Sequence, residues 1–371
     1  MKTIEELNKI RVEKKVELDL RKNTEADTRE KHILVCHGTG CTSSKSPQIL
    51  ENFNKLIKEK ELKNVRVIKT GCFGLCAKGP IVIIRPEDTF YAMVTPDDCK
   101  EIIESHIMGG KVVERLLCKD VDGKKVIKLD DLNFYKKQKR IALKNCGVIN
   151  PENIDEYIAF DGYRALGRVL FEMSSDEVIE TIEKAGLRGR GGAGFPTGKK
   201  WKSTKEAVGD KKYVVCNADE GDPGAFMDRS ILEGDPHAVL EAMEIAGYAI
   251  GAQKGYIYVR AEYPIAVRRL QIAIDQARKY GILGQNIFGT NFSFDIEIRL
   301  GAGAFVCGEE TALLESIEGK RGQPRVKPPY PAQKGLWECP TLINNVETFA
   351  NITQIILKGP EWYSSIGTET S

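Results

Sequence analysis

The chain has 371 residues, enough for two or three domains, and its 55 Lys and Arg residues nearly balance its 53 Asp and Glu residues, for a net charge of +2. This balance argues against a dedicated nucleic-acid binder, and no apolar run approaches the length that spans a membrane. The N-terminal stretch MKTIEELNKIRVEKKVELDLRKN is charged throughout and lacks the apolar core of a signal peptide, so we predict a cytoplasmic protein.

The first 110 residues predict a charged helical lead, residues 1–30, and then a compact α/β unit, residues 31–110. Apolar periodicity separates the strands of this unit from its helices. The expected elements, in chain order, are a buried strand in KHILVCHG, a helix with an early proline in SPQILENFNKLIKEKEL, a strand in NVRVIKTGC, a hairpin in IVIIRPEDTFYAMV and a helix in PDDCKEIIESHI.

Residues 111–150 are basic and mixed and are expected to form a connector, whereas residues 151–371 alternate between strand and helix patterns. The alternation predicts a layered α/β domain. SSDEVIETIEKAGL predicts a helix that Ser174 or Ser175 caps and Gly186 ends. The later elements are strands in KYVVCN, GYIYVR and FDIEIRLG and helices in PHAVLEAMEIAGYAIGA, YPIAVRRLQIAIDQARKYG, GEETALLESIEG and LINNVETFANITQIILKG.

A glycine-rich, basic loop, LRGRGGAGFPTGKKW, stands at residues 187–201. Gly189, Gly191 and Gly194 satisfy the pattern G-x-G-x-x-G, but a predicted helix precedes them where a dinucleotide-binding fingerprint requires a strand. A phosphate- or flavin-binding loop remains, in which backbone N–H groups converge on an anion and basic side chains add charge. The alternative is a glycine-rich turn with solvated lysines.

Three further stretches place polar side chains beside predicted strands or helices. In CNADEGDPGAFMDR, three acids follow a strand, where carboxylates can accept hydrogen bonds from ribose or flavin groups; an acidic turn is the alternative. In LGAGAFVCGEETALLE, two glutamates stand in the first turn of a helix, which the helix dipole alone can explain. In RVKPPYPAQKGLW and TLINNVET, a lysine and a tyrosine can form one wall of a pocket, and two asparagines can cap a helix and aim it at a phosphate. The side chains are Asp219, Glu220, Asp222, Glu309, Glu310, Lys327, Tyr330, Asn344 and Asn345.

Four of the ten cysteines form two spaced pairs, Cys36-x4-Cys41 and Cys72-x3-Cys76, and each pair follows a predicted strand. In a reducing compartment, metal binding or redox chemistry is a better expectation for such cysteines than disulfides. Four thiolates at one end of a unit can bind zinc or an iron–sulfur cluster, and the spacing matches neither the plant ferredoxin run nor a zinc ribbon.

Taken together, the four stretches of the second domain closely resemble the NADH-binding flavoprotein subunit of respiratory complex I and its relatives in NAD-reducing hydrogenases and formate dehydrogenases. The resemblance runs from about residue 145 to the last residue. It implies that the domain, residues 151–371, binds FMN and that NADH stacks on the flavin. The implied flavin contacts are Gly189, Arg190, Gly191, Gly192, Lys200, Asn217, Asp219, Glu220, Gly308, Glu309, Glu310, Asn344 and Asn345, and the implied NADH contacts are Phe195, Lys200, Asp222, Glu310, Lys327 and Tyr330.

The sequence departs from complex I members of this family at two places. Phe305 stands where those members often carry tyrosine, and the triplet at residues 220–222 is EGD where they often carry ESE. Phe305 cannot donate a hydroxyl hydrogen bond, so we expect it only to pack. Asp222 is one methylene shorter than glutamate, so its carboxylate reaches less far toward a nucleotide.

The first domain resembles the thioredoxin-like [2Fe–2S] ferredoxin domain over roughly residues 30–110, with GCFGLCAKGP as its specific part. The resemblance implies that Cys36, Cys41, Cys72 and Cys76 hold a [2Fe–2S] cluster, with a zinc site as the alternative. The expected fold is therefore a thioredoxin-like α/β domain followed by a layered α/β FMN-binding domain.

A nicotinamide gives up two electrons as a hydride, whereas an iron–sulfur cluster takes one, and a flavin can exchange electrons either way. One chain with both sites therefore implies electron transfer from NADH to FMN to the cluster, or the reverse. Glu310 and Glu220 are the residues expected to place the nicotinamide and the isoalloxazine ring.

The fusion of the two domains resembles the diaphorase subunit of NAD-reducing or electron-bifurcating hydrogenases and of NAD-dependent formate dehydrogenases. We expect a subunit of a multisubunit soluble hydrogenase, with other iron–sulfur subunits as its partners. Formate dehydrogenase and complex I are alternatives, and a relay or scaffold subunit without nucleotide turnover is the alternative of another class. Members of the family usually continue into a helical domain with a [4Fe–4S] centre. We therefore expect the FMN- and NADH-binding domain, residues 151–371, to be truncated at its C-terminal end and the [4Fe–4S] cluster to lie in the missing region.

Overall fold

The fold is described by a computed structural model for residues 2–22 and 28–368. Its contacts divide the chain into two compact units. The N-terminal unit comprises Val12–Phe160 and Glu233–Asp235, and the C-terminal unit comprises Met1–Arg11, Asp161–Leu232 and Pro236–Ser371. Helix α1 (Ile4–Leu18), within the predicted helical lead, contributes residues to both units.

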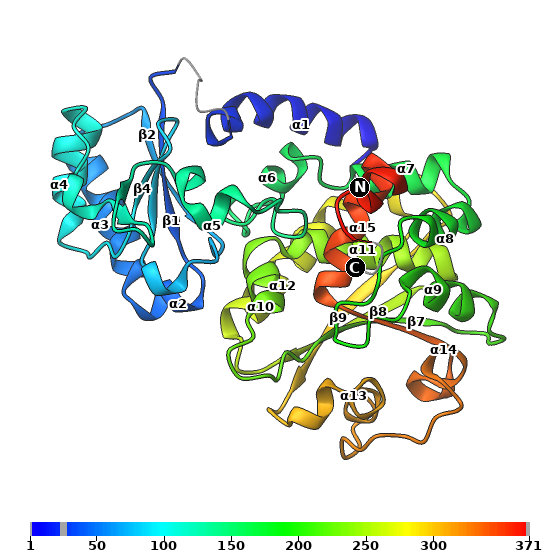
Figure 1. Cartoon of the computed structure of the whole chain (residues 1–371). Coiled ribbons are helices and arrows are strands. Elements are labelled where there is room, and N and C mark those ends of the chain that lie inside the picture. The colour runs from blue at the N-terminus through cyan, green and yellow to red at the C-terminus, as the bar shows by residue number, and fades with distance from the viewer. Residues whose placement is uncertain (1, 23–27, 369–371) are drawn as a thin grey trace. The chain divides into compact units, whose positions relative to one another are not determined.

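The N-terminal unit is built on a four-stranded mixed sheet with the order β2-β1-β3-β4 (Figure 1). Strand β1 pairs in parallel with β2 and antiparallel with β3, and β3 forms a hairpin with β4. This agrees with the predicted order of strand, helix, strand and hairpin. Its residues alternate between two cores: Ile33 and Val35 pack with Phe53 of α3, whereas Leu34 and Cys36 pack on the other face with Cys41. The elements are β1 (Lys31–Cys36), α2 (Thr39–Ser43), α3 (Ser46–Glu59), β2 (Val65–Thr70), η2 (Cys76–Lys78), β3 (Val82–Arg85), β4 (Thr89–Tyr91), α4 (Asp98–Glu101) and the π-helical η3 (Ile102–Met108).

The segment expected to be a connector contributes to the core of the N-terminal unit. Val126, Leu129 and Tyr135 are buried against the sheet face that carries Cys36. The segment therefore covers that face. Its elements are η4 (Glu114–Leu116), β5 (Cys118–Lys119), β6 (Lys125–Val126), η5 (Leu129–Asp131) and α5 (Asn133–Lys136), and α6 (Ile154–Ala159) follows.

The C-terminal unit is built on a parallel sheet of four strands with the order β10-β7-β8-β9. Helices α11 and α15 pack against one face, and α13 packs on the other through Leu313 and Leu314, which meet Val215 and Ile343 (Figure 1). The strands are β7 (Tyr213–Ala218), β8 (Lys254–Arg260), β9 (Asp295–Gly301) and β10 (Thr341–Asn345). The helices are α7 (Arg164–Glu172), α8 (Ser175–Lys184), α9 (Thr197–Glu206), α10 (Met227–Gly234), α11 (Pro236–Ile250), α12 (Pro264–Tyr280), η6 (Ile287–Gly289), η7 (Phe305–Gly308), α13 (Glu310–Ile317), α14 (Pro331–Lys334), η8 (Leu336–Glu338), α15 (Val346–Lys358) and α16 (Pro360–Ser364).

The parallel arrangement gathers the predicted site. The loops that follow β7 and β9, and the start of α15 directly after β10, leave the sheet at its carboxyl edge, which is where open α/β sheets bind ligands. Three of the four stretches singled out from the sequence contain one of these segments. Within the described residues, no helix is both long enough and apolar enough to cross a membrane.

Two sequence-based assignments in this unit were incomplete. The segment predicted as one helix from residue 342 onward consists of strand β10 and helix α15. Leu342 and Ile343 pair with Val214 and Val215 of β7 before α15 begins. Helix α9 was missed altogether. It packs so closely on α8 that a Cβ atom at Gly198 would lie 2.6 Å from the Cα atom of Glu183.

The predicted start of α8 is confirmed. Ser174 is the N-cap, and with Glu177 it forms a reciprocal capping box. Gly186 follows the helix with a φ of 67°, a conformation that favours glycine. The glycine-rich loop therefore starts from a well-defined helix end.

Candidate functional site

The glycine-rich loop closes on itself and enters α9 directly. The Gly189 N–H donates to the Phe195 carbonyl at 2.9 Å, and the Thr197 N–H donates to the Leu187 carbonyl at 2.9 Å. Gly192 has a φ of 103°, which a residue with a side chain rarely adopts. Backbone N–H groups at the tip of such a loop are free to meet an anion.

The loop tip lies against the start of α15. A Cβ atom at Gly191 would lie 3.4 Å from the Cβ atom of Asn345, and the Arg190 N–H donates to Thr348 Oγ1 at 2.9 Å. Asn345 is the N-cap of α15 and accepts from the Glu347 N–H at 2.9 Å. The positive end of a 13-residue helix therefore stands beside the glycine loop, which is the character of a phosphate site.

Only one of the two predicted asparagines caps a helix. Asn344 lies in β10, is buried, and accepts a 2.9 Å hydrogen bond from the indole N–H of the fully buried Trp201. This bond ties β10 to α9. The side chain of Arg190 extends toward α16, with Nη2 3.5 Å from the Tyr363 hydroxyl.

The loops after β7 and β9 are tied together at Asn217. Its Nδ2 donates to the Gly308 carbonyl at 2.9 Å, and its Oδ1 accepts from the Asp219 N–H at 3.1 Å. A Cβ atom at Gly308 would lie 3.3 Å from the Asp219 carbonyl oxygen, so the two loops approach closely. Burial raises the pKa of Asp219, and the nearby Arg260 opposes that rise.

The Glu220 carboxylate caps helix α10. It accepts from the backbone N–H groups of Asp228 and Arg229, each at 3.1 Å, while its carbonyl oxygen accepts from Arg260 Nη1 at 2.7 Å. The Tyr263 hydroxyl lies 3.3 Å from the same carboxylate. Burial and the Glu220 charge raise the pKa of Tyr263 to about 12. Glu220 therefore holds the loop of residues 220–228 in shape.

Asp228, which the sequence analysis did not single out, connects two predicted flavin contacts. Its Oδ2 accepts from Asn345 Nδ2 at 2.6 Å, and its N–H donates to Glu220. The side chain is buried, and its Oδ1 has no hydrogen-bond partner among the described residues. Burial and the Glu220 charge raise the pKa of Asp228 to about 8.

Glu310 lies between two lysines from different parts of the chain. Its carboxylate is 3.3 Å from Lys200 Nζ of α9 and 3.1 Å from Lys327 Nζ. Glu309 is the N-cap of α13, and it also accepts from Lys327 at 2.9 Å. Burial alone would raise the pKa of Glu309, but hydrogen bonds from Thr311 and Lys327 lower it. Glu309 and Glu310 therefore form one ion-paired cluster with Lys200 and Lys327.

Three of the predicted nucleotide contacts are exposed. Phe195 is 51% exposed, Tyr330 is 57% exposed, and Asp222 is exposed as well. Phe305, 70% exposed, packs on Gly221, where a Cβ atom would lie 2.9 Å from its ring. The Phe305 ring thus occupies the space that a side chain at residue 221 would need.

The four predicted ligand cysteines gather at one end of the N-terminal unit. Cys72 Sγ lies 3.8 Å from Cys76 Sγ, and contacts with Cys41 and Cys72 raise the pKa of the Cys36 thiol. Cys76 is exposed, whereas the other three are buried. The structure therefore brings the two spaced pairs together.

Glycines leave room for these sulfurs. A Cβ atom at Gly79 would lie 2.6 Å from Cys41 Sγ, and one at Gly40 would lie 3.5 Å from Cys76 Sγ. Within residues 2–22 and 28–368, no group of three or more His, Cys, Asp or Glu side chains is placed to hold a single metal ion. Four thiols in two pairs, with side-chain-free backbone beside them, fit a two-iron cluster.

Glu233, which the sequence analysis also missed, contacts the loop between the first two cysteines. Its carboxylate accepts from the Thr39 N–H at 2.9 Å and from the Thr39 hydroxyl. A Cβ atom at Gly38 would lie 3.2 Å from both the Cys72 Cβ atom and a Glu233 carboxylate oxygen. Sequence spacing gives no signal for this contact, because 194 residues separate Thr39 from Glu233.

The fold and these two groups of residues define an iron–sulfur flavoprotein. Residues 182–354 match the Nuo51 FMN-binding domain, and residues 22–106 match the thioredoxin-like [2Fe–2S] ferredoxin. The chain thus combines a Nuo51 FMN-binding domain with a thioredoxin-like [2Fe–2S] ferredoxin domain that precedes it. The predicted fold class and the predicted FMN and [2Fe–2S] cofactors are thereby confirmed.

Curated relatives include subunits of an NADP-reducing hydrogenase and of NADH-quinone oxidoreductases. The chain is 64% identical over 236 residues to the NADP-reducing hydrogenase subunit HndC of Solidesulfovibrio fructosivorans, covering 64% of this chain and 48% of the relative. It is 56% identical over 227 residues to a subunit of the NADH-quinone oxidoreductase of Aquifex aeolicus, covering 61% of this chain and 53% of the relative. The chain thus spans about half the length of these relatives.

Among solved structures, the H2-reduced NAD+-reducing [NiFe]-hydrogenase resembles most of the chain. The match has a TM-score of 0.54 and 27% identity, and it covers 97% of this chain and 58% of that chain. Both domains of this chain are therefore within the range of the match.

Proposed function

We propose that this chain is the NADH-oxidising flavoprotein subunit of a multisubunit hydrogenase, working in the cytoplasm and passing electrons between NADH and iron–sulfur clusters. The observation that carries the proposal is that one chain combines an FMN-binding domain with a [2Fe–2S] ferredoxin domain. FMN, when bound, accepts a hydride from NADH and releases the electrons singly. The 64% identity to a hydrogenase subunit supports the hydrogenase context.

The phosphate end of the flavin would be held by backbone groups. The loop at Gly191 lies beside the start of α15, because Gly191 approaches the N-cap residue Asn345 closely. The helix dipole favours an anion there. Lys200 adds a positive charge from α9, although its Nζ also donates to the Ile343 carbonyl at 3.2 Å.

The nucleotide would be placed by the cluster around Glu310. Lys200 and Lys327 hold this carboxylate from two sides, so its position is fixed before a ligand arrives. Phe195 and Tyr330 offer exposed rings for stacking. Glu220 acts by holding the loop of residues 220–228, which leads to Asp222 and Asp228.

The cluster would exchange electrons at its exposed edge. Cys76 is exposed and the other three cysteines are buried, so a partner iron–sulfur subunit would approach from the side of Cys76.

The test is cofactor content and NADH-dependent dye reduction after anaerobic reconstitution with FMN, iron and sulfide. We expect flavin and iron to bind, and NADH to bleach the flavin absorbance. A chain that binds both cofactors but does not respond to NADH would instead be a relay or scaffold subunit. NADPH in the same assay shows which nucleotide is preferred.

A complex I context is the second candidate, because the NADH-quinone oxidoreductase relative from Aquifex aeolicus is 56% identical over its matched region. Isolation of the native assembly separates the two: a hydrogenase reduces NAD+ with hydrogen, whereas a complex I reduces quinone with NADH. Formate-dependent NAD+ reduction would indicate the formate dehydrogenase alternative. If the hydrogenase also requires a second, low-potential acceptor for NADH oxidation, it bifurcates electrons.

A further inference from the structure

The loop that carries Lys327 and Tyr330 has little apolar packing to hold it in place. Between α13 and η8, the described structure contains only one short helix, α14, and Val326 is 88% exposed. Long exposed loops of this kind are usually mobile unless polar contacts fix them. The position of Lys327 therefore needs another explanation.

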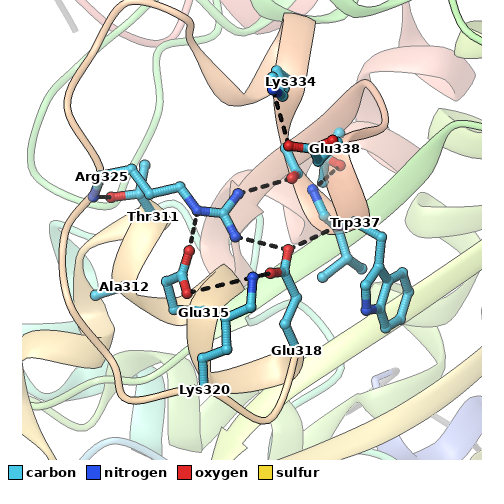
Figure 2. Close-up of polar contacts among 12 residues, drawn as sticks. Thr311, Ala312, Glu315, Glu318, Lys320, Arg325, Lys334, Trp337 and Glu338 are labelled. Atoms are coloured by element: carbon cyan, nitrogen blue, oxygen red, sulfur yellow. Dashed lines mark hydrogen bonds and ion pairs between the residues drawn. The ribbon is translucent and has the colours of Figure 1, made fainter.

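Arg325 supplies the polar contacts that close this loop (Figure 2). Its Nε donates to the Glu315 carboxylate, its Nη2 donates to Glu318 at 2.7 Å, and its Nη1 donates to the Gly335 carbonyl at 2.9 Å. Its backbone N–H also donates to Thr311 Oγ1 at 2.8 Å. One guanidinium thus joins α13 to both ends of the segment 326–334.

The carboxylates that receive Arg325 are themselves fixed. The Glu318 side chain is 3% exposed, and it accepts from the Trp337 N–H at 2.8 Å and from Lys320 at 2.7 Å. Burial alone would raise the pKa of Glu318, but hydrogen bonds from Lys320 and Arg325 lower it. Arg325 is therefore bound to two carboxylates, Glu315 and Glu318, at the end of α13, and other hydrogen bonds hold Glu318 in place.

We propose that Arg325 is a positioning residue for the nucleotide site, an inference that rests on the function proposed above. It acts through the backbone: Lys327 follows it by two residues and reaches Glu309 at 2.9 Å and Glu310 at 3.1 Å. Closing the segment 326–334 holds Lys327 and Tyr330 where a dinucleotide can meet them. None of the predicted flavin-phosphate contacts lies in this segment.

The test compares Arg325→Met and Arg325→Lys with the unmodified chain, in the FMN-loaded full chain. Arg325→Lys keeps the charge but cannot span three acceptors, so it remains informative if Arg325→Met does not fold. Lys320→Met is the control, since it removes a cation from the same network but not the loop closure. We expect both Arg325 variants to raise KM for NADH about tenfold or more, with kcat and bound FMN within about twofold, and the control to keep its KM.

A second readout does not depend on nucleotide chemistry. Trypsin should cut the Lys334–Gly335 bond of the folded chain faster in the Arg325 variants than in Lys320→Met, because the loop opens. Faster cutting with unchanged KM would overturn the proposal, as would loss of FMN together with the rise in KM. If the unmodified chain is inert to NADH, the proposed function fails first, and the trypsin result still shows whether Arg325 closes the loop.

Discussion

Replacing Asp228 by Asn should change how the stability of the C-terminal unit depends on pH. Burial and the Glu220 charge raise the pKa of Asp228 from 3.8 to about 8 in the folded chain. Glu347 of α15 and the Asn345 amide also face the carboxyl group, and Cys216 of β7 lies within reach of its charge. In the unfolded chain the same carboxyl group should titrate near its ordinary value.

The sign follows from proton binding. Below about pH 4 the carboxyl group is neutral in both states, whereas between about pH 4 and pH 8 only the folded state keeps the proton. Stability therefore falls as pH rises through this window, by about 1.4 kcal/mol per pH unit and by no more than about 6 kcal/mol in total. Asp228→Asn removes this dependence and still accepts the hydrogen bond from Asn345.

Urea unfolding at pH 5, 6 and 7 measures the effect. All three tryptophans of the chain, Trp201, Trp337 and Trp362, belong to the C-terminal unit, so their fluorescence follows that unit alone. We expect the variant to gain about 1.4 kcal/mol over the unmodified chain with each pH unit. Asp210→Asn, at an exposed position in the same unit, is the control and should run parallel to the unmodified chain. Parallel curves for Asp228→Asn as well would refute a protonated carboxyl group at this position.

Three further substitutions test the two sites. Gly79→Ala places a methyl group 2.6 Å from a predicted ligand sulfur and should lower iron incorporation severalfold, whereas Gly40→Ala, at an ordinary 3.5 Å, should load normally in the same iron assay. Glu310→Ala removes the acceptor shared by two lysines and should impair NADH oxidation with artificial acceptors while FMN stays bound; unchanged steady-state kinetics would remove this residue from the site. Gly221→Ser must displace the ring of Phe305 and should weaken NADH binding, measured by flavin bleaching, and the double substitution with Phe305→Ala should recover part of the loss.

Local pattern was enough to predict most of the fold. A short apolar run identifies β1, amphipathic periodicity identifies α3, and the capping box at Ser174 identifies the start of α8. Helix α9 escaped because its sequence, TGKKWKSTKE, has one large apolar residue, and its position depends on contact with α8. Strand β10 escaped because only two of its five residues, Leu342 and Ile343, are apolar, so the segment is equally compatible with the first turn of the helix that follows it.

The candidate site was predictable where a motif concentrates its residues and not where tertiary contacts join distant ones. The glycine loop and the paired cysteines are visible as spacing in the sequence. Asp228 reads in the sequence as an ordinary acid near a helix start; what distinguishes it is a hydrogen bond to an asparagine 117 residues away. Arg325 likewise stands in a proline-rich stretch, and its role emerges only when α13 supplies Glu315 and Glu318.

These missed residues share a physical role that motif reading cannot assign. A ligand contact must present free groups, so it is exposed and sits in a recognisable loop, as Phe195 and Asp222 do. A group that fixes such a loop forms its hydrogen bonds with other protein groups, as Asp228 and Arg325 do. Glu220 lies in a loop, as a ligand contact does, but its hydrogen bonds are those of a residue that fixes the loop, since both carboxylate oxygens cap α10. Its removal should therefore disturb flavin binding through the loop at least as much as through direct contact, and that places Glu220 with the residues that shape the site.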